Sequence, residues 1–392
     1  MRELVVIDKL NMGGVTSSLL NYLEFASRYH QIDLLVFSNV VDTSRLPNSI
    51  KLVKSPSLLS LLGFSQKEVK KKSLWWGLLR GLMAVGSKLI GGHYIRRIMF
   101  SFLRCIGSYD VAISYTHDVS WKVLTTGCND FVLQKVKAKH KISFVHCDYK
   151  LFGGYDKRGE QIYRKFDTIV CVSKGCKKSF IECFPTLESK TVVCENFIDI
   201  ENINKFSEPA APFINKKFKL VTVCRVEEQK GVFRIIDVAR RLREDGYGNF
   251  VWRIVGDGPD LENIRANVVA FGLEGVIDIV GKQNPPYRYI NGATLFVLPS
   301  YHEAAPMVFG ECRVLGIPVL STRTTSADEL LAKRGVGIVC ENNTEAIYES
   351  IMKVVSGMIE LPVIGENMSA KTNEQAEKDF WLLNDRIKRH LV

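Results

Sequence analysis

The sequence contains no long apolar segment. No stretch free of Asp, Glu, Lys and Arg exceeds 14 residues, the length of Tyr289–His302, whereas spanning a bilayer takes roughly 18–20 apolar residues. The apolar run near the N-terminus, Leu4–Ile7, is also too short for the core of a secretory signal peptide. Neither a transmembrane anchor nor an export signal is therefore predicted, and we expect a soluble or surface-bound protein in the cytoplasm.

The sequence also lacks the cysteine pattern of a metal or disulfide framework. Its ten cysteines do not form the two closely spaced pairs that a zinc site needs. Several of them, such as Cys171 and Cys224, lie in apolar runs typical of strands. Buried thiols in a reducing compartment are the simplest interpretation.

Positive charge is present in excess and is unevenly distributed. The net charge is +11, and the segment Gln66–Arg104 holds nine Lys or Arg and a single acid, Glu68. The same segment contains Trp75, Trp76 and many aliphatic residues. This mixture is typical of a segment that lies on an anionic membrane surface, but two core helices with solvated basic faces would also produce it. No motif for nucleic-acid recognition accompanies the charge, so a nucleic-acid partner is not expected.

Strand-like and helix-like segments alternate along the whole chain. Leu4–Asp8, a glycine-containing loop, a helical pattern over Thr16–Tyr29 and a strand at Ile32–Phe37 form the first such unit. A second series begins at Lys219–Cys224, after a polar segment with two prolines. The pattern predicts an α/β fold of two doubly wound, Rossmann-like domains facing across a ligand cleft. The expected parts are a first domain over 1–198, a linker over 199–216, a second domain over 217–372 and an amphipathic helix over 373–392 that crosses back to the first domain.

Charged residues follow two strands of the expected second domain. Arg225 and Lys230 come after the strand Lys219–Cys224, and Glu303 comes after the strand Thr294–Leu298. Ligands of open α/β sheets bind at the carboxyl ends of the strands. Because a guanidinium and an ammonium in one loop can hold two linked phosphates, this edge is predicted to bind a diphosphate.

Glycines and a helix N-terminus add to the same edge. Gly256 and Gly258 have no side chain that would keep a ligand away from the backbone. Met307 and Val308 open a predicted helix, and their free first-turn amides suit an anion. Glu311 lies one turn further on, where a carboxylate can accept hydrogen bonds from a ribose.

The first domain offers two weaker signals. Gly13 and Gly14 precede its first helix and could close over the same phosphates. His146 follows the strand Lys141–Val145. Taken alone, His146 is better interpreted as a hydrogen-bonded interior histidine.

Together these motifs resemble those of the family 4 glycosyltransferases of the GT-B type, retaining enzymes that use nucleotide sugars. The resemblance covers nearly the whole chain; it is strongest from Cys224 to Leu331 and weakest from Pro47 to Tyr109. Glu303 and Glu311, with seven residues between them, match the two-glutamate motif of the family. The other matching segments are Gly13-Gly14-Val15, His146, Val172-Ser173, Asn196–Asp199, Arg225 with Lys230-Gly231, and Gly256–Pro259.

The resemblance implies a role for each matching residue. Arg225 and Lys230 would neutralise the departing diphosphate, Glu311 would hold the ribose hydroxyls, and Glu303 would face the donor sugar. The other implied contacts are Gly13, Gly14, Gly256 and Gly258 near the phosphates, the amides of Met307 and Val308 with phosphate or sugar oxygens, and His146 beside the sugar.

The implied reaction is sugar transfer from a nucleotide-diphosphate donor, expected to be a UDP-sugar, to a lipid-linked or oligosaccharide acceptor at the inner face of the membrane. No cofactor and no metal are expected, because the sequence has no Asp-x-Asp motif and two cations can take the metal's place. Two alternatives stay open: transfer to a soluble small acceptor, and a catalytically silent subunit that binds nucleotide sugar. The segment Thr324–Glu329 and Ala304-Ala305 depart from the family's pattern, so the donor sugar is not predicted. Arg313 lies where the family often has a small residue, and the resemblance does not explain it.

Overall fold

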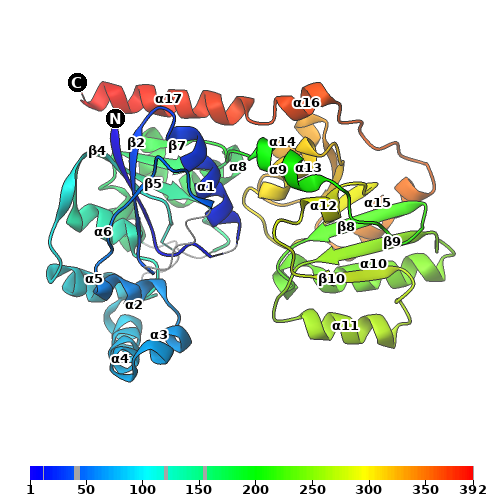
Figure 1. The fold of residues 1–392 in the computed structure, drawn as a ribbon, viewed down its shortest axis with the longest axis horizontal. Helices are drawn as coiled ribbons and strands as arrows, with labels where there is room; N and C mark the ends of the chain where they lie inside the picture. The colour runs from blue at the N-terminus through cyan, green and yellow to red at the C-terminus, as the bar shows by residue number, and fades with distance from the viewer. Residues whose placement is uncertain (12, 39–44, 119–121, 153–156, 392) are drawn as a thin grey trace. The chain divides into compact units, whose positions relative to one another are not determined.

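The computed structural model describes residues 1–11, 13–38, 45–118, 122–152 and 157–391 of the chain. These residues form two compact units (Figure 1). The first unit consists of Met1–Phe197 together with Gln375–Val392, and the second unit consists of Ile198–Glu374. Each unit is built around its own parallel sheet, so the chain has the two α/β domains that the alternating pattern predicts.

The sheet of the first unit has seven strands in the order β3-β2-β1-β4-β5-β6-β7, and all its neighbouring pairs run parallel. The strand order reverses direction between β1 and β4, which makes their carboxyl ends the topological switch point of this sheet. The central strands are almost continuously apolar because helices cover both faces of a doubly wound sheet. The strands are β1 (Arg2–Ile7), β2 (Gln31–Val36), β3 (Lys51–Leu52), β4 (Ile106–Ser114), β5 (Val136–Val145), β6 (Thr168–Cys171) and β7 (Thr191–Val193).

The helices of the first unit divide into those that cover the sheet and a group that extends from it. Figure 1 shows α3 and α4 beyond α2 and α5, away from the strands of this unit. The hydroxyls of Ser65 and Ser73 cap α3 and α4, so both helix starts are encoded locally. The bounds are α1 (Gly14–Ala26), α2 (Ser60–Gly63), α3 (Gln66–Lys72), α4 (Leu74–Ile90), α5 (Gly92–Ser101), α6 (Cys128–Lys135), α7 (Lys157–Tyr163), α8 (Lys174–Cys183) and α17 (Glu374–Leu391).

The sheet of the second unit has six parallel strands in the order β10-β9-β8-β11-β12-β13. Its switch point lies between β8 and β11. Trp252 in β9 is wholly buried and donates from Nε1 to Thr222 Oγ1 over 3.0 Å. The strands are β8 (Phe218–Val223), β9 (Phe250–Val255), β10 (Ile277–Gly281), β11 (Leu295–Leu298), β12 (Val319–Thr322) and β13 (Gly337–Cys340); the helices are α9 (Ile200–Ser207), α10 (Val232–Glu244), α11 (Leu261–Ala270), α12 (Tyr287–Ile290), α13 (Met307–Val314), α14 (Ala327–Leu330), α15 (Thr344–Val355) and α16 (Glu366–Ala370).

The segment expected to be a linker, 199–216, differs from that expectation because it contains helix α9. The Asp199 side chain caps α9 by accepting from the Asn202 amide over 3.1 Å. Ile198, just before the helix, packs on α13 at Gly310, where an added Cβ would lie 2.4 Å from Ile198 Cγ1. The segment therefore belongs to the second unit rather than lying free.

Helix α17 packs on the first unit. Phe380 is wholly buried, and its ring centroid lies 5.2 Å from that of Phe25 in α1. Asp379, one residue earlier, accepts from the Glu195 amide over 3.2 Å. The apolar face of this C-terminal segment is thus covered by residues far away in the sequence.

None of the helices in the described part of the chain is both long and apolar enough to span a bilayer.

Candidate functional site

An ion pair bridges the switch point of the second sheet. Lys230 follows β8, Glu303 follows the neighbouring β11, and Lys230 Nζ lies 2.7 Å from Glu303 Oε1. The Ser300 hydroxyl donates to the same carboxylate oxygen over 2.8 Å. Two residues 73 positions apart in the sequence are therefore held in one site.

Close backbone contact between the two loops explains how the pair is formed. Gly231 adopts φ +70°, and an added Cβ there would lie 2.0 Å from the Pro299 carbonyl oxygen. The Tyr301 amide donates to the Gln229 carbonyl over 3.0 Å. Only glycine at position 231 allows both the left-handed conformation and this approach.

Arg234 and Asn342 hold the loop that presents Glu303. The buried Arg234 guanidinium donates to the Pro299 carbonyl over 2.9 Å and to Asn342 Oδ1 over 2.8 Å, and it lies 3.5 Å from the centre of the Tyr301 ring. Asn342 in turn donates to the Tyr301 carbonyl over 2.8 Å. The sequence reasoning missed both residues. A signal was present, because Arg234 lies in the first turn of α10, where the helix dipole disfavours a cation.

The glycines of the Gly256–Pro259 turn have a different role from the expected one. An added Cβ would lie 1.8 Å from the Cys224 carbonyl oxygen at Gly256 and 2.2 Å from the Val226 carbonyl oxygen at Gly258. The close neighbour in the Cβ direction is thus the backbone of the loop that carries Arg225. These glycines let the turn pack against that loop, and their contact with a ligand stays a prediction.

Arg225 itself remains largely accessible. Its Nε lies 3.2 Å from Glu227 Oε2, and 68% of its side chain is exposed. An exposed ion pair of this kind contributes little to stability. The guanidinium can therefore turn to an anionic ligand at small cost.

Helix α13 presents an uncapped N-terminus at the same edge. Pro306 precedes it, and no side chain caps the helix at Met307 and Val308, so its first-turn amides are available as donors. Glu311 lies one turn inside, and burial alone raises the pKa of its carboxyl to about 7. A carboxylate removed from water in this way is stabilised by hydroxyl donors from a ligand.

In the first unit, the expected residues lie around the switch point between β1 and β4. Gly13 and Gly14 open α1, and His146 follows β5. Ser18 of α1 is hydrogen-bonded to the Tyr115 hydroxyl over 2.8 Å, and the Tyr115 ring lies 4.8 Å from that of His146. The start of α1 and His146 are therefore joined through one buried tyrosine.

His117 is a second histidine at this edge that the sequence reasoning missed. It follows β4, and its Nδ1 accepts from the His146 amide over 3.4 Å. Burial lowers the pKa of His117 to about 4, and burial together with the neighbouring His117 lowers that of His146 to about 3. Both imidazoles are therefore neutral at pH 7, which suits hydrogen bonding to sugar hydroxyls rather than binding of phosphate.

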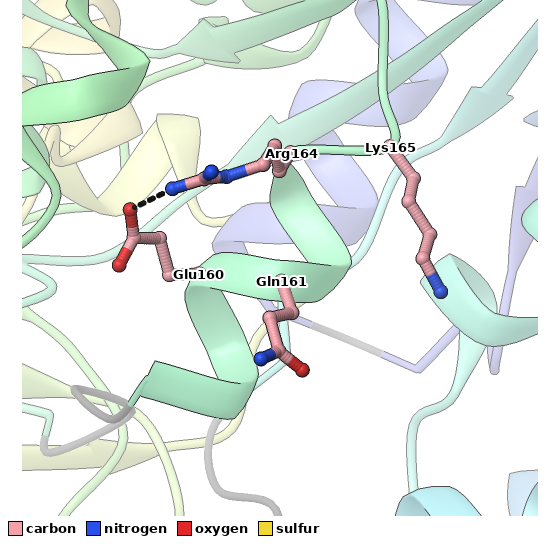
Figure 2. A pocket seen from close by; sticks show the side chains of 4 residues that line it. All are labelled: Glu160, Gln161, Arg164 and Lys165. Carbon is pink, nitrogen blue, oxygen red and sulfur yellow. Dashed lines mark hydrogen bonds and ion pairs between the residues drawn. The ribbon is translucent and has the colours of Figure 1, made fainter.

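A pocket on α7 lies apart from these residues. Figure 2 shows its lining of Glu160, Gln161, Arg164 and Lys165. Arg164 Nη2 lies 2.8 Å from Glu160 Oε1, so the pocket's carboxylate already pairs with one of its two cations. It does not contain the residues that the sequence singled out, and we assign it no role in the site.

The two doubly wound units, each with polar residues at the switch point of its sheet, define the class of the protein as a GT-B fold. The solved structure of Anabaena HepE in complex with UDP is similar over its whole length, with a TM-score of 0.64, 15% identity and coverage of 100% of this chain and 99% of that one. At this identity the similarity establishes the fold.

Comparison of sequences points to a family. Residues 204–379, a little under half of the chain, match the family described as "Glycosyl transferases group 1". The chain is 27% identical over 238 residues to the colanic acid biosynthesis glycosyltransferase WcaL of Salmonella typhimurium, covering 58% of this chain and 56% of that protein. It is also 27% identical over 183 residues to the amylovoran biosynthesis glycosyltransferase AmsK of Erwinia amylovora, covering 44% of each. The matches thus span about half the length of these relatives. The resemblance to a group 1, GT-B glycosyltransferase is confirmed.

Proposed function

We propose that this protein is a retaining glycosyltransferase that moves a sugar from a nucleotide-diphosphate donor, a UDP-sugar, to a lipid-linked or oligosaccharide acceptor in surface polysaccharide biosynthesis. The observation that carries the proposal is the Lys230–Glu303 pair across the switch point of the second sheet. The names of the relatives WcaL and AmsK support polysaccharide synthesis, and UDP in the HepE structure supports the nucleotide.

The residues of the second unit suit the donor. Arg225 and Lys230 would stabilise the diphosphate as the bond between the sugar's anomeric carbon and the phosphate oxygen breaks. Glu303 would face the donor sugar, and Glu311 would accept hydrogen bonds from the ribose. The Met307 and Val308 amides, together with the dipole of α13, would contact phosphate or sugar oxygens, as would Gly13 and Gly14 of the first unit.

Retention of configuration follows if the acceptor attacks from the face that the phosphate leaves. The new bond then forms between the acceptor oxygen and the anomeric carbon, and the departing phosphate takes the acceptor's proton. His146, neutral in its buried position, would hydrogen-bond the sugar and keep it oriented during this exchange. No carboxylic acid is needed to protonate the leaving group, because the diphosphate is already a stable anion.

We propose that the reaction needs no metal ion. The sequence has no Asp-x-Asp motif, and Arg225 and Lys230 supply two positive charges at the diphosphate. The acceptor would be met at the cytoplasmic face of the membrane, with the protein attached peripherally.

The test is a survey of UDP-sugars for thermal stabilisation, followed by release of UDP from those that bind. We expect one UDP-sugar to raise the unfolding temperature, to be consumed in the presence of a lipid-linked acceptor, and to give a product of unchanged anomeric configuration. The activity should survive excess EDTA. An inverted product, or metal-reversible loss of activity, would contradict the mechanism; binding without any turnover would point to the silent subunit.

A further inference from the structure

Helix α4 is amphipathic, but unlike an ordinary surface helix it turns its apolar face to the solvent. Trp75, Leu78, Leu82, Val85 and Leu89 recur at intervals of three and four residues, so they line one face of the helix, and all five are exposed. Trp75 is 80% exposed, Leu82 73% and Leu89 75%. The sequence alone left open whether these residues belong to a core, and the structure excludes that for these five.

The buried face of α4 is made of small and polar residues. An added Cβ at Gly77 would lie 2.6 Å from Lys70 Cγ, and one at Gly86 would lie 3.1 Å from Ile95 Cδ1. These glycines let α3 and α5 pack closely against the helix, which leaves no room for larger side chains at positions 77 and 86.

Arg80 fixes the orientation of α4. It is 7% exposed, and it donates to the Leu61 carbonyl over 3.0 Å and to Gln66 Oε1 over 2.9 Å. Gln66 donates back to the Gly77 carbonyl over 2.7 Å. Turning the leucines inward would break these bonds and expose the glycines, so the outward direction of the apolar face is specified by the rest of the helix.

Helix α5 repeats the arrangement. Tyr94, Ile98 and Phe102 follow one another at four-residue intervals from α5 into its C-cap, and all three are exposed. Arg96 is buried instead, with its Nε 2.6 Å from Asp130 Oδ2. Two consecutive helices thus bury an arginine and expose an apolar stripe. An exposed apolar stripe such as that of α4 marks an interaction site.

We infer that the outward apolar stripe of α4, extended by that of α5, inserts into the interfacial layer of an anionic lipid bilayer. The inference rests on the proposed function for the membrane-bound acceptor and names the surface that would meet the membrane. The helix lies in the plane of the bilayer rather than across it, because 17 residues extend only about 25 Å and one face is polar.

The charge around the stripe selects lipid over another copy of the chain. Exposed basic residues on α3, α4, α5 and the segment after α5 are Lys67, Lys70, Lys71, Lys88, Arg97 and Arg104, against the single acid Glu68. In a two-fold dimer the same patch faces itself, so these cations would be brought toward their own copies. Anionic headgroups attract the cations, while the acyl region accepts the leucines and Trp75.

Apolar insertion and charge attraction differ in their response to salt. The Debye length falls to about 3 Å at 1 M salt, which removes most of the attraction of the lysines but leaves the apolar contribution in place. Binding should therefore weaken at high salt without disappearing.

The experiment is flotation of the full chain with vesicles of phosphatidylcholine alone and of phosphatidylcholine with phosphatidylglycerol, at 0.1 and 1 M salt. The test variant is Leu78→Ser with Leu82→Ser. Its matched control is Leu382→Ser with Met358→Ser, which changes two comparably exposed apolar residues elsewhere. A charge variant changes Lys67, Lys70 and Lys71 to Gln.

We expect wild type and the matched control to float with the anionic vesicles and to be partly retained at 1 M salt. The leucine variant should lose at least tenfold in partitioning at both salt concentrations, because each buried apolar side chain contributes roughly that factor. The lysine variant should lose mainly the preference for anionic vesicles. Trp75 fluorescence should shift to shorter wavelength on binding, and a Trp75→Phe variant should reduce that shift.

Equal flotation of the leucine variant and wild type would overturn the inference. A second result would also overturn it: the wild type binds neither kind of vesicle and sediments as a dimer, and the leucine variant sediments as a monomer. That result would assign the stripe to contact with a second copy of the chain. Unfolding temperatures of the variants establish that they fold. Release of UDP from the donor should be equal in wild type and the leucine variant. If the wild type binds vesicles but releases no UDP, the proposed function is refuted and the inference about the membrane-binding surface still holds.

Discussion

Lys230 Nζ lies 2.7 Å from Glu303 Oε1, and the two residues follow neighbouring strands on opposite sides of the point where the strand order reverses. Without a ligand, each charge compensates the other in a partly buried position. A diphosphate that arrives at this edge offers Lys230 a second anion, and a sugar hydroxyl offers Glu303 a donor. Under the proposed function, the pair would be a preformed cradle whose two members face different parts of one donor.

Replacement of Lys230 by Ala should lower kcat by a factor of about 100 to 1,000, or roughly 2.7–4 kcal/mol, as loss of a preorganised electrostatic donor does. Arg225→Ala should lie in the same range. Steady-state rates with the cognate UDP-sugar measure the effect, and Lys333→Ala, an exposed lysine of the same unit, is the control. Near-wild-type rates in both site variants would contradict the assignment.

Replacement of the two glutamates should separate sugar from nucleotide. Glu311→Ala should weaken binding of UDP and of the UDP-sugar equally, because the lost contact is to the ribose. Glu303→Ala should weaken binding of the UDP-sugar more than binding of UDP. Calorimetric titration of each variant with both ligands measures this difference. The division of roles is refuted if the two variants show the same pattern.

Nucleotide binding should depend on pH through Glu311. Burial raises the pKa of this carboxyl to about 7, so the ligand-free protein holds the proton below that pH. Ribose hydroxyls favour the ionised form, which means that UDP binding expels the proton, strengthens as pH rises toward 7 and levels off above it. Below pH 7 the affinity should fall by up to about tenfold per pH unit.

A Glu311→Gln variant is the control for this pH dependence, because the titration of the UDP phosphate itself is common to both proteins. The difference between the two proteins in log Kd, measured from pH 5.5 to 8, should therefore isolate the carboxyl. Parallel curves would show that Glu311 does not exchange a proton on binding.

The fold was predictable because the strands carry their own signals. Apolar runs such as Leu4–Ile7 and Val251–Val255, separated by helical patterns, have few arrangements other than parallel sheets. The boundary at 199–216 was less predictable. Its polar composition is typical of a linker, but Ile203 has a partner in the core of the second unit, and that contact is non-local.

The positions of Arg225, Lys230 and Glu303 at one edge of the second sheet were predictable, because each of them follows a strand that the sequence itself indicates. Arg234 and Asn342 were missed because they act through the loop of Glu303, and that relation exists only in three dimensions. Arg313, whose presence the resemblance left unexplained, anchors α16 by donating to the Met368 carbonyl over 2.8 Å.

The C-terminal helix should contribute measurably to stability through Phe380. Its ring is wholly buried against α1, so Phe380→Ala should lower the free energy of unfolding by about 3–5 kcal/mol. Leu382→Ala, on the exposed face of the same helix, should change it by no more than about 0.5 kcal/mol. Denaturant titration measures both values, and equal effects would show that α17 does not pack through Phe380.

Arg234 should act as a positioning residue for Glu303. Its guanidinium holds the Pro299 carbonyl, Asn342 and the Tyr301 ring at once. Lysine cannot reproduce this fork and stacking geometry, so Arg234→Lys should fail to rescue the defect of Arg234→Met.

Both Arg234 variants should lower kcat about tenfold or more, equivalent to about 1.4 kcal/mol. They should also weaken binding of the UDP-sugar more than binding of UDP, because only the loop that carries Glu303 loses its anchor. The affinity for UDP, which the ribose contact of Glu311 would govern, should stay close to that of wild type. A purely structural role would instead lower the unfolding temperature and leave the ratio of the two affinities unchanged. The comparison of that ratio with the unfolding temperature therefore decides between positioning and general stability.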